Sequence, residues 1–303
     1  KGESIWLAHF LAGLLADWAV IHDRRGDAAR ATDYRNRRQK LIDAINEHAW
    51  DGKWYIRATL DSGETLGSAR NRAGKIFLNA QTWALLNETA PDDRAKQCYA
   101  SARELLFDDV GALLLAPAYD DPTPEVGYIT RYAPGLRENG GVYTHAATWA
   151  IAAAAKMRDS ASVARLLNAI NPANKDADRY WAEPYVTPGN VDGPLSPYYG
   201  RGGWTWYTGS AAWLHRVIAE WVLGVRPEWD GLRIEPCLPP DWDHVAIQRP
   251  YRGARLAISI ERDGALAADQ IEISVDGKRI EGTLVKPEQL AGAARQIAVR
   301  IGR

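Results

Sequence analysis

The stretch SIWLAHFLAGLLADWAVIHD, residues 4–23, places apolar side chains at every third or fourth position. This spacing gathers them on one face of an α-helix, and Ser4 is a residue type that caps helix N-termini. Stretches with the same periodicity continue through the first two thirds of the chain. They predict helices at about 27–47, 80–88, 92–106, 146–157, 160–169 and 209–223. The chain therefore begins with helices in consecutive pairs, and Asn79 is expected to cap the third helix.

The periodicity changes after Gly224. Segments that alternate apolar and polar side chains follow at 232–236, 244–251, 254–262, 270–285 and 295–301. Alternation with a period of two predicts β-strands, and Asp276-Gly277 predicts a hairpin turn. A short hairpin is also expected within residues 50–63. The sequence thus predicts a helical domain over residues 1–224 and a small antiparallel β domain over 225–303.

Two long segments between helices, 108–144 and 171–208, are rich in Gly, Pro, Tyr and Trp. Loops of this length are uncommon unless they are functional. Each of them runs into the start of a helix, where backbone N–H groups carry a partial positive charge. We therefore expect the functional residues in these two segments.

The composition excludes several classes of function. The 37 Lys and Arg nearly balance the 38 Asp and Glu, so no basic field exists to hold nucleic acid or anionic lipid. Cys98 and Cys237 lack the spacing of a metal site or a disulfide framework. We see no apolar run near about 18 residues. The expectations are no nucleic-acid partner, no membrane contact and, with a reducing compartment favoured, a cytoplasmic location.

The aromatic residues are unusual, with 13 Trp and 13 Tyr against 3 Phe. Rings with a polar edge can stack on sugar faces and hydrogen-bond to hydroxyls, although a large core also uses Trp. The chain has no Walker-type loop and no GxSxG motif. The GRGG run at 200–203 follows no predicted strand, so it is not a dinucleotide fingerprint. The composition favours a carbohydrate ligand and no nucleotide cofactor.

The first motif that could carry chemistry is RENGGVYTHAA, residues 137–147. Gly140-Gly141 allows a close backbone approach or a positive φ. His145 stands where a helix begins, so its imidazole could donate to an anion with the help of the helix dipole. The alternative is that His145 only caps the helix.

Two further motifs lie in the second long segment. In YWAEPYVTPGNVDGP, residues 180–194, Glu183 stands between aromatic residues, where it could accept hydrogen bonds from sugar hydroxyls or simply be satisfied by loop backbone. In GRGGWTWYTGSAAW, residues 200–213, Thr208 and Gly209 begin a helix, as an anion nest or as an ordinary N-cap. Taken separately, each motif can be explained by its purely structural alternative. Two helix starts rich in anion donors and framed by aromatics together favour a ligand site.

Several ordered runs resemble family 94 glycoside phosphorylases. They are GYITRYAPGLRENGGVYTHAATWA (127–150), EPYV (183–186), WYTGSAAW (206–213) and LGVRPEWDGLRIEPCLP (223–239). GESIWLAHFL (2–11) and NAQTWALL (79–86) fit the same family, so the resemblance covers residues 2 to about 240. The first run is most similar to the cyclic β-glucan synthase and β-1,2-oligoglucan branch.

The resemblance implies a mainly α fold, an (α/α)6 barrel followed by a small β-sandwich or jelly-roll-like domain. The helices predicted here are fewer than such a barrel requires. The chain opens at Lys1 and its only methionine is Met157. We therefore expect residues 1–224 to be a partial barrel whose N-terminal helices precede Lys1 in a longer protein.

The resemblance also implies inverting phosphorolysis of β-glucosides or β-glucan oligosaccharides to α-glucose 1-phosphate. A carboxylic acid protonates the glycosidic oxygen while phosphate attacks the anomeric carbon from the opposite face. The phosphate is a co-substrate, and no cofactor is implied. By motif, the residues that bind phosphate would be His145, Thr208 and Gly209. Those that bind sugar would be Arg137, Glu138, Glu183 and, unless it belongs to the barrel core, Gln81.

The chain departs from the family pattern at two places. The general acid of the family lies in a DWNDGM-like motif just before the sequence that matches KGESIWL, so we expect no catalytic acid within this chain and no activity of the chain alone. None of Asp17, Asp23 and Asp27 matches that motif. Cellobiose phosphorylases also carry a Gln where this chain has Thr187-Pro188-Gly189, which leaves the sugar specificity open.

Three functions remain open at this point. The first is a phosphorylase acting on β-1,2-glucan chains, the second an inverting hydrolase or transglycosylase on the same barrel, and the third a non-catalytic carbohydrate-binding fragment. An anion site favours the first, because an attacking water needs a carboxylate base whereas phosphate needs hydrogen-bond donors. The expected partners are an oligosaccharide and phosphate, and the resemblance also implies a homodimer as one option. If the chain is part of a glucan synthase, the expected location is the cytoplasmic face of the membrane.

Overall fold

The computed structural model describes residues 1–292 and 294–302. These residues form two compact units. Unit 1 contains residues 1–157 and 165–214, and unit 2 contains the described residues of 158–164 and 215–303. The chain passes between the units just after Met157, within the helix 160–170 and within the helix 210–217.

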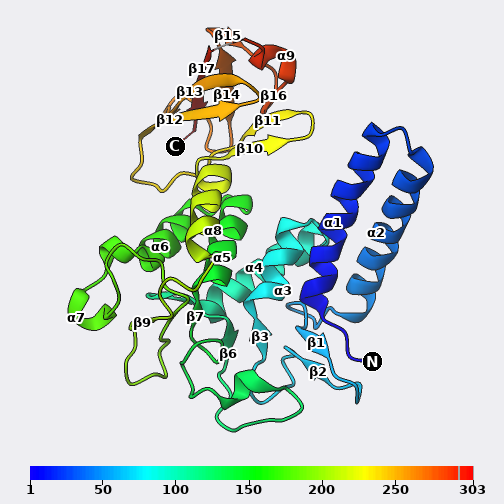
Figure 1. The fold of residues 1–303 in the computed structure, drawn as a ribbon, viewed down its shortest axis with the longest axis vertical. Helices are drawn as coiled ribbons and strands as arrows, with labels where there is room; N and C mark the ends of the chain where they lie inside the picture. The colour runs from blue at the N-terminus through cyan, green and yellow to red at the C-terminus, as the bar shows by residue number, and fades with distance from the viewer. Residues whose placement is uncertain (293, 303) are drawn as a thin grey trace. The chain divides into compact units, whose positions relative to one another are not determined.

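Unit 1 is built on helices that pack against their neighbours in the chain. α1 (Ile5–Arg24) and α2 (Ala28–His48) lie side by side and run in opposite directions (Figure 1). α3 (Leu78–Leu86) packs against α1, against α4 (Asp92–Leu106) and against α5 (Thr144–Lys156). Further helical segments are η1 (Tyr128–Arg131), η2 (Pro172–Asn174) and α7 (Ala177–Tyr180). α6 (Ser160–Ile170) and α8 (Ser210–Val217) each have residues in both units, and the π-helical turn η3 (Ile218–Val222) belongs to unit 2.

The predicted caps hold for the first two helices and fail for the third. The Ser4 side chain accepts from the Leu7 amide, and Asp27 accepts from Arg30. Asn79, in contrast, is the second residue of α3, and its buried Oδ1 has no hydrogen-bond partner among the described residues. A strand leads directly into α3, so the helix starts earlier than a polar cap would indicate.

Short strands occupy the segments between the helices. They pair as β1 (Ala58–Thr59) with β2 (Thr65–Leu66), β3 (Ile76–Phe77) with β6 (Leu115–Ala116), and β4 (Phe107–Asp108) with β5 (Gly111–Ala112). A further sheet joins β7 (Val142–Tyr143), β8 (Asn190–Val191) and β9 (Gly202–Gly203) in antiparallel order. Within the segment 50–63, where a hairpin was predicted, Trp50 and Tyr55 form an antiparallel bridge across the turn at Asp51-Gly52, and a second hairpin, β1–β2, begins at Ala58. The two long segments are tied together by the β7–β8–β9 sheet.

Four tryptophans connect the helices of unit 1 in one cluster. They come from α1, α3, α5 and α8, and are Trp6, Trp83, Trp149 and Trp213. Their ring centroids lie 5.2 to 6.3 Å apart in four contacting pairs, three of them edge-to-face. Edge-to-face contacts match the electrostatics of the rings and add to the free energy gained by burial. The cluster is the element of the core that holds α1, α3, α5 and α8 together.

One side of α1 is apolar and exposed. Large side chains recur at helical spacing along it, namely Leu7, Phe10, Leu11, Leu14 and Trp18. Contrary to the sequence expectation, α1 is long and apolar enough to cross a membrane, judged by length and composition alone. Core helices of soluble proteins and signal sequences meet the same criterion, so this finding assigns no membrane contact.

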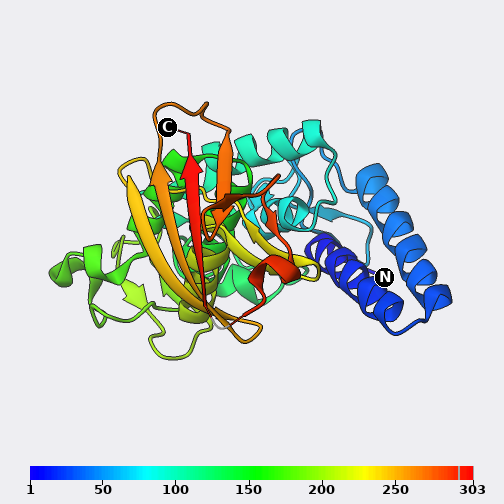
Figure 2. The same ribbon diagram turned by 90° about the horizontal axis from the view of Figure 1, so that it is seen from above.

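Unit 2 contains two sheets that share one hydrophobic core. The first is β10 (Val225–Glu228), β11 (Gly231–Ile234) and β16 (Leu284–Val285). The second has the order β12 (His244–Tyr251), β13 (Ala254–Arg262), β17 (Ala294–Ile301), β14 (Ile271–Val275), β15 (Lys278–Arg279), as Figure 2 shows from above. A single helical turn, α9 (Pro287–Leu290), precedes β17. The Asp276-Gly277 turn joins β14 to β15 with positive φ at both residues, as predicted.

Two expectations about the fold class need correction. Strand β17 pairs with β13 in parallel, so the second sheet is mixed and not purely antiparallel. The described chain as a whole mixes helix and strand and is not mainly α. The alternating pattern in β13 and β17 predicts strands but carries no information about their order or direction, because both are set by contacts between distant segments.

The buried His9 of α1 makes the stability of the chain depend on pH. Its Nδ1 lies 2.6 Å from Thr89 Oγ1, and burial lowers its pKa from 6.5 to about 3. Between pH 6.5 and 3, His9 therefore binds a proton in the unfolded chain but stays neutral in the folded chain. The stabilising contribution is complete above pH 6.5 and is lost as the pH falls toward 3. At pH 5 we expect a loss of about 2 kcal/mol from this residue.

The measurement is a urea titration, followed by circular dichroism at pH 7 and pH 5, of the wild type and His9→Gln. The variant should lose less stability than the wild type between the two pH values. His48→Gln is the matched control, because the His48 ring is exposed at the end of α2. An equal pH dependence of His9→Gln and wild type would contradict the assignment.

Candidate active site

The N-termini of α5 and α8 meet at one loop, residues 187–189. The Thr144 amide, in the first turn of α5, donates to the Gly189 carbonyl at 3.0 Å. The Ser210 hydroxyl, at the start of α8, lies 3.4 and 3.3 Å from the Thr187 and Pro188 carbonyls. These contacts bring together two helix starts that are far apart in the sequence. The partial positive charges of both are thereby directed to one region.

His145 and Gly209 lie close together at this junction. A Cβ added to Gly209 would lie 3.2 Å from His145 Cε1 and 3.6 Å from Nδ1, which is close contact. The imidazole also contacts Trp149 and Trp213, with ring centroids 5.1 and 5.9 Å away. Burial lowers the pKa of His145 below its usual value. At neutral pH the ring is therefore neutral, with one N–H to donate.

Thr208 precedes α8 and already serves the helix. Its Oγ1 accepts from the Ser210 amide at 3.0 Å, which is the N-cap arrangement. The hydroxyl hydrogen remains to donate to a ligand. The cap and the ligand contact are thus compatible for the same side chain. Half-buried Thr208 precedes exposed Gly209, the residue that lies close to His145, so both side chains belong to the segments that meet here.

The loop around Arg137 is held from the inside by the buried amide of Asn139. Asn139 Nδ2 donates to the carbonyls of Tyr119 and Tyr132, both at 2.8 Å, and its Oδ1 accepts from the Tyr119 amide at 2.7 Å. A Cβ at Gly141 would lie 2.5 Å from the Arg137 carbonyl oxygen, so the backbone folds back on itself there. The Gly-Gly of the motif is explained by this close approach.

Arg137 lies between two aromatic rings. Its guanidinium carbon is 4.7 Å from the centroid of Tyr132 and 4.2 Å from that of Trp204. Its Nε is 3.6 Å from Glu138 Oε2, a buried atom with no hydrogen-bond partner among the described residues. A buried carboxylate oxygen without a donor is costly. Glu138 is therefore arranged to accept a hydrogen bond from a group that enters the site.

Glu183 is not satisfied as a buried loop carboxylate would be. It lies near the surface, where its Oε1 accepts from the indole N–H of Trp206 at 2.8 Å. Hydrogen bonds from its own backbone amide and from Trp206 hold the pKa of the Glu183 carboxyl below its usual value. The Glu183 carboxylate is thus ionised at neutral pH. Its hydrogen-bond partner, Trp206, is two residues before Thr208 in the chain.

Gln81 lies in the core and is fully engaged there. Its Nε2 donates to the carbonyls of Tyr55 and Phe77 at 2.8 and 3.0 Å, and its Oε1 accepts from the Tyr55 amide at 2.9 Å. The side chain has no exposed surface. Of the two roles considered for Gln81, sugar binding and helical core, these contacts correspond to the helical core.

Three tryptophans in the second long segment have positive φ. The values are 51° for Trp181, 57° for Trp204 and 70° for Trp206. A bulky residue in the left-handed region is uncommon and costs backbone energy. All three side chains are exposed. The second long segment therefore presents aromatic rings at the surface, a feature that the sequence indicated only through its Trp and Tyr content.

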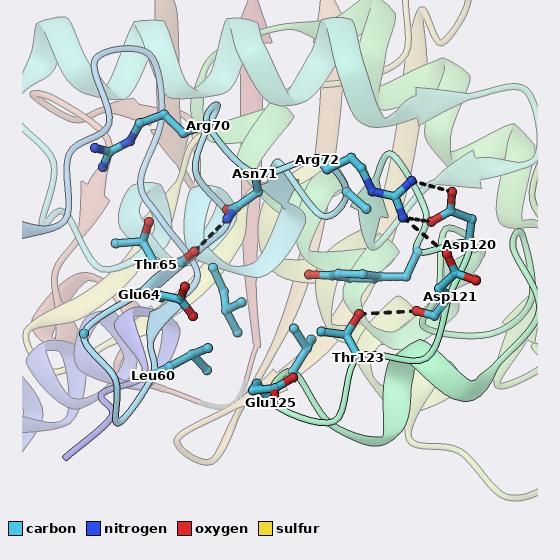
Figure 3. A pocket seen from close by; sticks show the side chains of 15 residues that line it. Leu60, Glu64, Thr65, Arg70, Asn71, Arg72, Asp120, Asp121, Thr123 and Glu125 are labelled. Carbon is cyan, nitrogen blue, oxygen red and sulfur yellow. Dashed lines mark hydrogen bonds and ion pairs between the residues drawn. The ribbon is translucent and has the colours of Figure 1, made fainter.

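A separate pocket of about 740 Å³ lies between the β1–β2 hairpin and the loop after β6 (Figure 3). Arg72 reaches across it to Asp120 and Asp121, with a bond of 2.9 Å from Nη1 to Asp120 Oδ2. The pocket is open and polar, and none of the predicted site residues lines it. Among the described residues, no cluster of His, Cys, Asp and Glu could hold a metal ion. The helix junction is the better candidate for chemistry because its donors converge.

Residues 1–224 match the catalytic domain of the glycosyl hydrolase 94 superfamily, and residues 225–281 match the C-terminal domain of glycosyl hydrolase family 65. The chain belongs to the glycosyl hydrolase 94 superfamily. The family assignment made from the sequence motifs is confirmed. The family 94 match covers the α5 and α8 starts and the loop between them.

Relatives of this family 94 chain include characterised enzymes. It is 32% identical over 285 residues to the solabiose phosphorylase of Paenibacillus borealis and 30% identical over 305 residues to the N,N'-diacetylchitobiose phosphorylase of Vibrio proteolyticus. It is 35% identical over 296 residues to the cyclic β-(1,2)-glucan synthase NdvB of Rhizobium meliloti. These alignments cover 93%, 99% and 94% of the chain. The chain spans only 37%, 38% and 10% of the lengths of these relatives.

Two solved structures share the fold at low sequence identity. A sialidase matches 86% of the family 94 chain and 24% of its own, with a TM-score of 0.64 and 15% identity. A GH78 family rhamnosidase of Bacillus sp. GL1 matches 97% of the chain and 27% of its own, with a TM-score of 0.55 and 15% identity. These likenesses concern the fold alone.

Proposed function

We propose that the longer protein containing this family 94 chain carries out inverting phosphorolysis of β-glucosides. The proposed substrates are β-glucan oligosaccharides, with β-1,2-linked chains preferred, and the product is α-glucose 1-phosphate. Phosphate would attack the anomeric carbon while a carboxylic acid protonates the leaving oxygen. We propose, from the family motif, that the catalytic acid lies outside these residues. The chain alone is therefore expected to be inactive.

The observation that supports this proposal is the contact between His145 and the start of α8. A neutral imidazole N–H and the Thr208 hydroxyl stand at the starts of two helices, α5 and α8, that meet at the loop 187–189. An attacking phosphate requires preorganised donors of this kind and no general base. Arg137, Glu138 and Glu183 would then bind sugar hydroxyls beside the phosphate, with donor and acceptor groups on both sides.

We also propose that unit 1 is part of an (α/α)6 barrel completed by helices outside these residues. α2 packs on α1 and α4 on α3, as alternating outer and inner helices would. The exposed apolar side of α1 needs a cover. The indole N–H groups of Trp6, Trp83 and Trp149 are buried and have no acceptor among the described residues. Helices that supply apolar side chains and acceptors would satisfy both requirements.

The second candidate is an inverting hydrolase or transglycosylase on the same substrates, and the third a non-catalytic carbohydrate-binding fragment. NdvB is named a synthase, which favours the transglycosylase within the second candidate. Water would need a carboxylate base to attack. The only carboxylates we place at the site, Glu138 and Glu183, come from sugar-binding motifs, so we prefer phosphorolysis.

The test is an assay of the longer protein with a β-1,2-linked glucose disaccharide, with and without inorganic phosphate. We expect glucose 1-phosphate to appear only when phosphate is present, and its anomeric configuration, read by NMR, to be α. Release of free glucose at a rate that does not respond to phosphate would assign the hydrolase instead. The absence of any sugar product would assign the non-catalytic role for these substrates.

A further inference from the structure

We propose that Tyr128, Tyr132 and Trp204 form an aromatic platform that binds glycosyl residues of a substrate longer than a disaccharide. The inference rests on the proposed function and names the substrate class of that site. The platform consists of these three residues and the two arginines that contact them, Arg131 and Arg137. It links the two long segments of the chain at the surface of unit 1.

The platform is a continuous series of ring–ring and cation–ring contacts. The rings of Tyr128 and Tyr132 lie edge-to-face with centroids 5.4 Å apart. The Arg131 guanidinium lies 5.6 Å from the Tyr128 centroid, and that of Arg137 lies between Tyr132 and Trp204. A guanidinium covers one face of a ring and fixes its orientation. The rings are thus held in place, Tyr128 at the start of η1 and the other two on loops.

Tyr128 and Trp204 are exposed, whereas another aromatic residue of the segment 108–144 is buried in a hydrophobic cluster. Tyr119, earlier in the segment, is only 7% exposed and packs with Phe77 and Leu115. Tyr128, in contrast, is 66% exposed, and Trp204 is 56% exposed. Aromatic surface left in water is unfavourable unless something covers it. The fold therefore buries one aromatic of this region and presents the others to a ligand.

The chemistry of the platform matches a sugar chain. A pyranose ring has an apolar face that stacks on an aromatic ring, and hydroxyls at its edge that need polar partners. The two guanidinium groups supply planar sets of N–H donors between the rings. The net charge of the chain is −1, which gives no support for an anionic polymer as the ligand. A neutral oligosaccharide fits this alternation of rings and donors.

The platform begins at the candidate active site. The Gly189 amide donates to the Trp204 carbonyl at 3.0 Å, and the Gly189 carbonyl accepts from Thr144, next to His145. Trp204 is therefore at the end near the helix junction, and Tyr128 is at the far end of the series. Thr130 Oγ1 accepts from the Thr123 amide at 2.8 Å and so fixes the turn that carries Tyr128. Sugar units bound at the junction would extend over Trp204 toward Tyr128.

The test compares the longer protein and its variants on a β-1,2-linked glucose disaccharide and pentasaccharide. We expect Tyr128→Ala to lower the ratio of kcat/KM for the pentasaccharide to that for the disaccharide about tenfold, the equivalent of ~1.4 kcal/mol. Trp204→Ala should lower it at least as much. Tyr128→Phe, which keeps the ring, should restore the wild-type ratio. Trp229→Ala, an exposed tryptophan of unit 2, is the matched control and should not change the ratio.

A calorimetric titration with the pentasaccharide in the absence of phosphate separates this inference from the proposed function. If no glucose 1-phosphate forms but the pentasaccharide binds about tenfold more weakly to Tyr128→Ala, the platform stands and phosphorolysis falls. If phosphorolysis occurs and the chain-length ratio is the same in Tyr128→Ala and wild type, the platform is overturned. Equal pentasaccharide affinity of the two proteins would overturn it as well.

Discussion

Replacement of His145 by alanine in the longer protein is expected to lower phosphorolytic kcat/KM by about 10²–10³-fold. The imidazole contacts Gly209 and is held by Trp149 and Trp213, so its N–H is oriented before phosphate arrives. A preorganised donor stabilises the charge that develops in the transition state without reorganisation. The loss should appear in the dependence on phosphate concentration, measured at saturating disaccharide.

His145→Asn should recover part of the loss, because an amide N–H replaces the imidazole N–H at similar reach. His48→Ala, at an exposed ring on α2, should behave as the wild type. Equal activity of His145→Ala and wild type at limiting phosphate would remove His145 from the phosphate site. The same result for a Thr208→Val variant would show that neither donor contacts phosphate.

Trp149→Ala is expected to lower the free energy of unfolding by about 3–5 kcal/mol. Trp149 is only 7% exposed and contacts Trp6, Trp83 and Trp213, so its removal leaves a cavity that borders three other helices. The substitution also removes the Trp149 ring from beside His145, where the two ring centroids lie 5.1 Å apart. A denaturant titration followed by far-UV circular dichroism measures the change.

Trp149→Phe fills most of the cavity and should cost clearly less than the alanine variant. Trp181→Phe alters an exposed ring and is the matched control, expected within about 0.5 kcal/mol of the wild type. A stability of Trp149→Ala equal to that of the control would mean that the four tryptophans do not form a common core.

Periodicity predicted the helices of unit 1 because each has a buried side set by neighbours close in the chain. The predicted helix at 160–169 corresponds to α6, Ser160–Ile170. The start of α5 was placed at 146, whereas the helix begins at Thr144. The Thr144 amide is bonded to Gly189, a residue far along the chain. No local pattern contains such a contact, so the sequence could not place the start of α5 correctly.

The site shows the same division between local and distant information. The motifs identified the helix starts that carry His145 and Thr208, and the structure brings these segments together. The roles of Tyr128, Tyr132 and Trp204 were not foreseen individually. Their signal was the excess of Tyr and Trp over Phe, a property of the whole chain that assigns no position. The interaction of Arg137 with both rings required the fold, because it joins the two long segments.

The left-handed tryptophans limit how far this chain can be thermostabilised. Glycine would relax the backbone at Trp181, Trp204 or Trp206, where a side chain costs of order ~1–2 kcal/mol, but it would delete the ring. At Trp204, a residue of the proposed platform, stability and the proposed carbohydrate affinity therefore compete. An engineer who wants a more durable enzyme would leave these loops alone and look for gains in the sheets of unit 2.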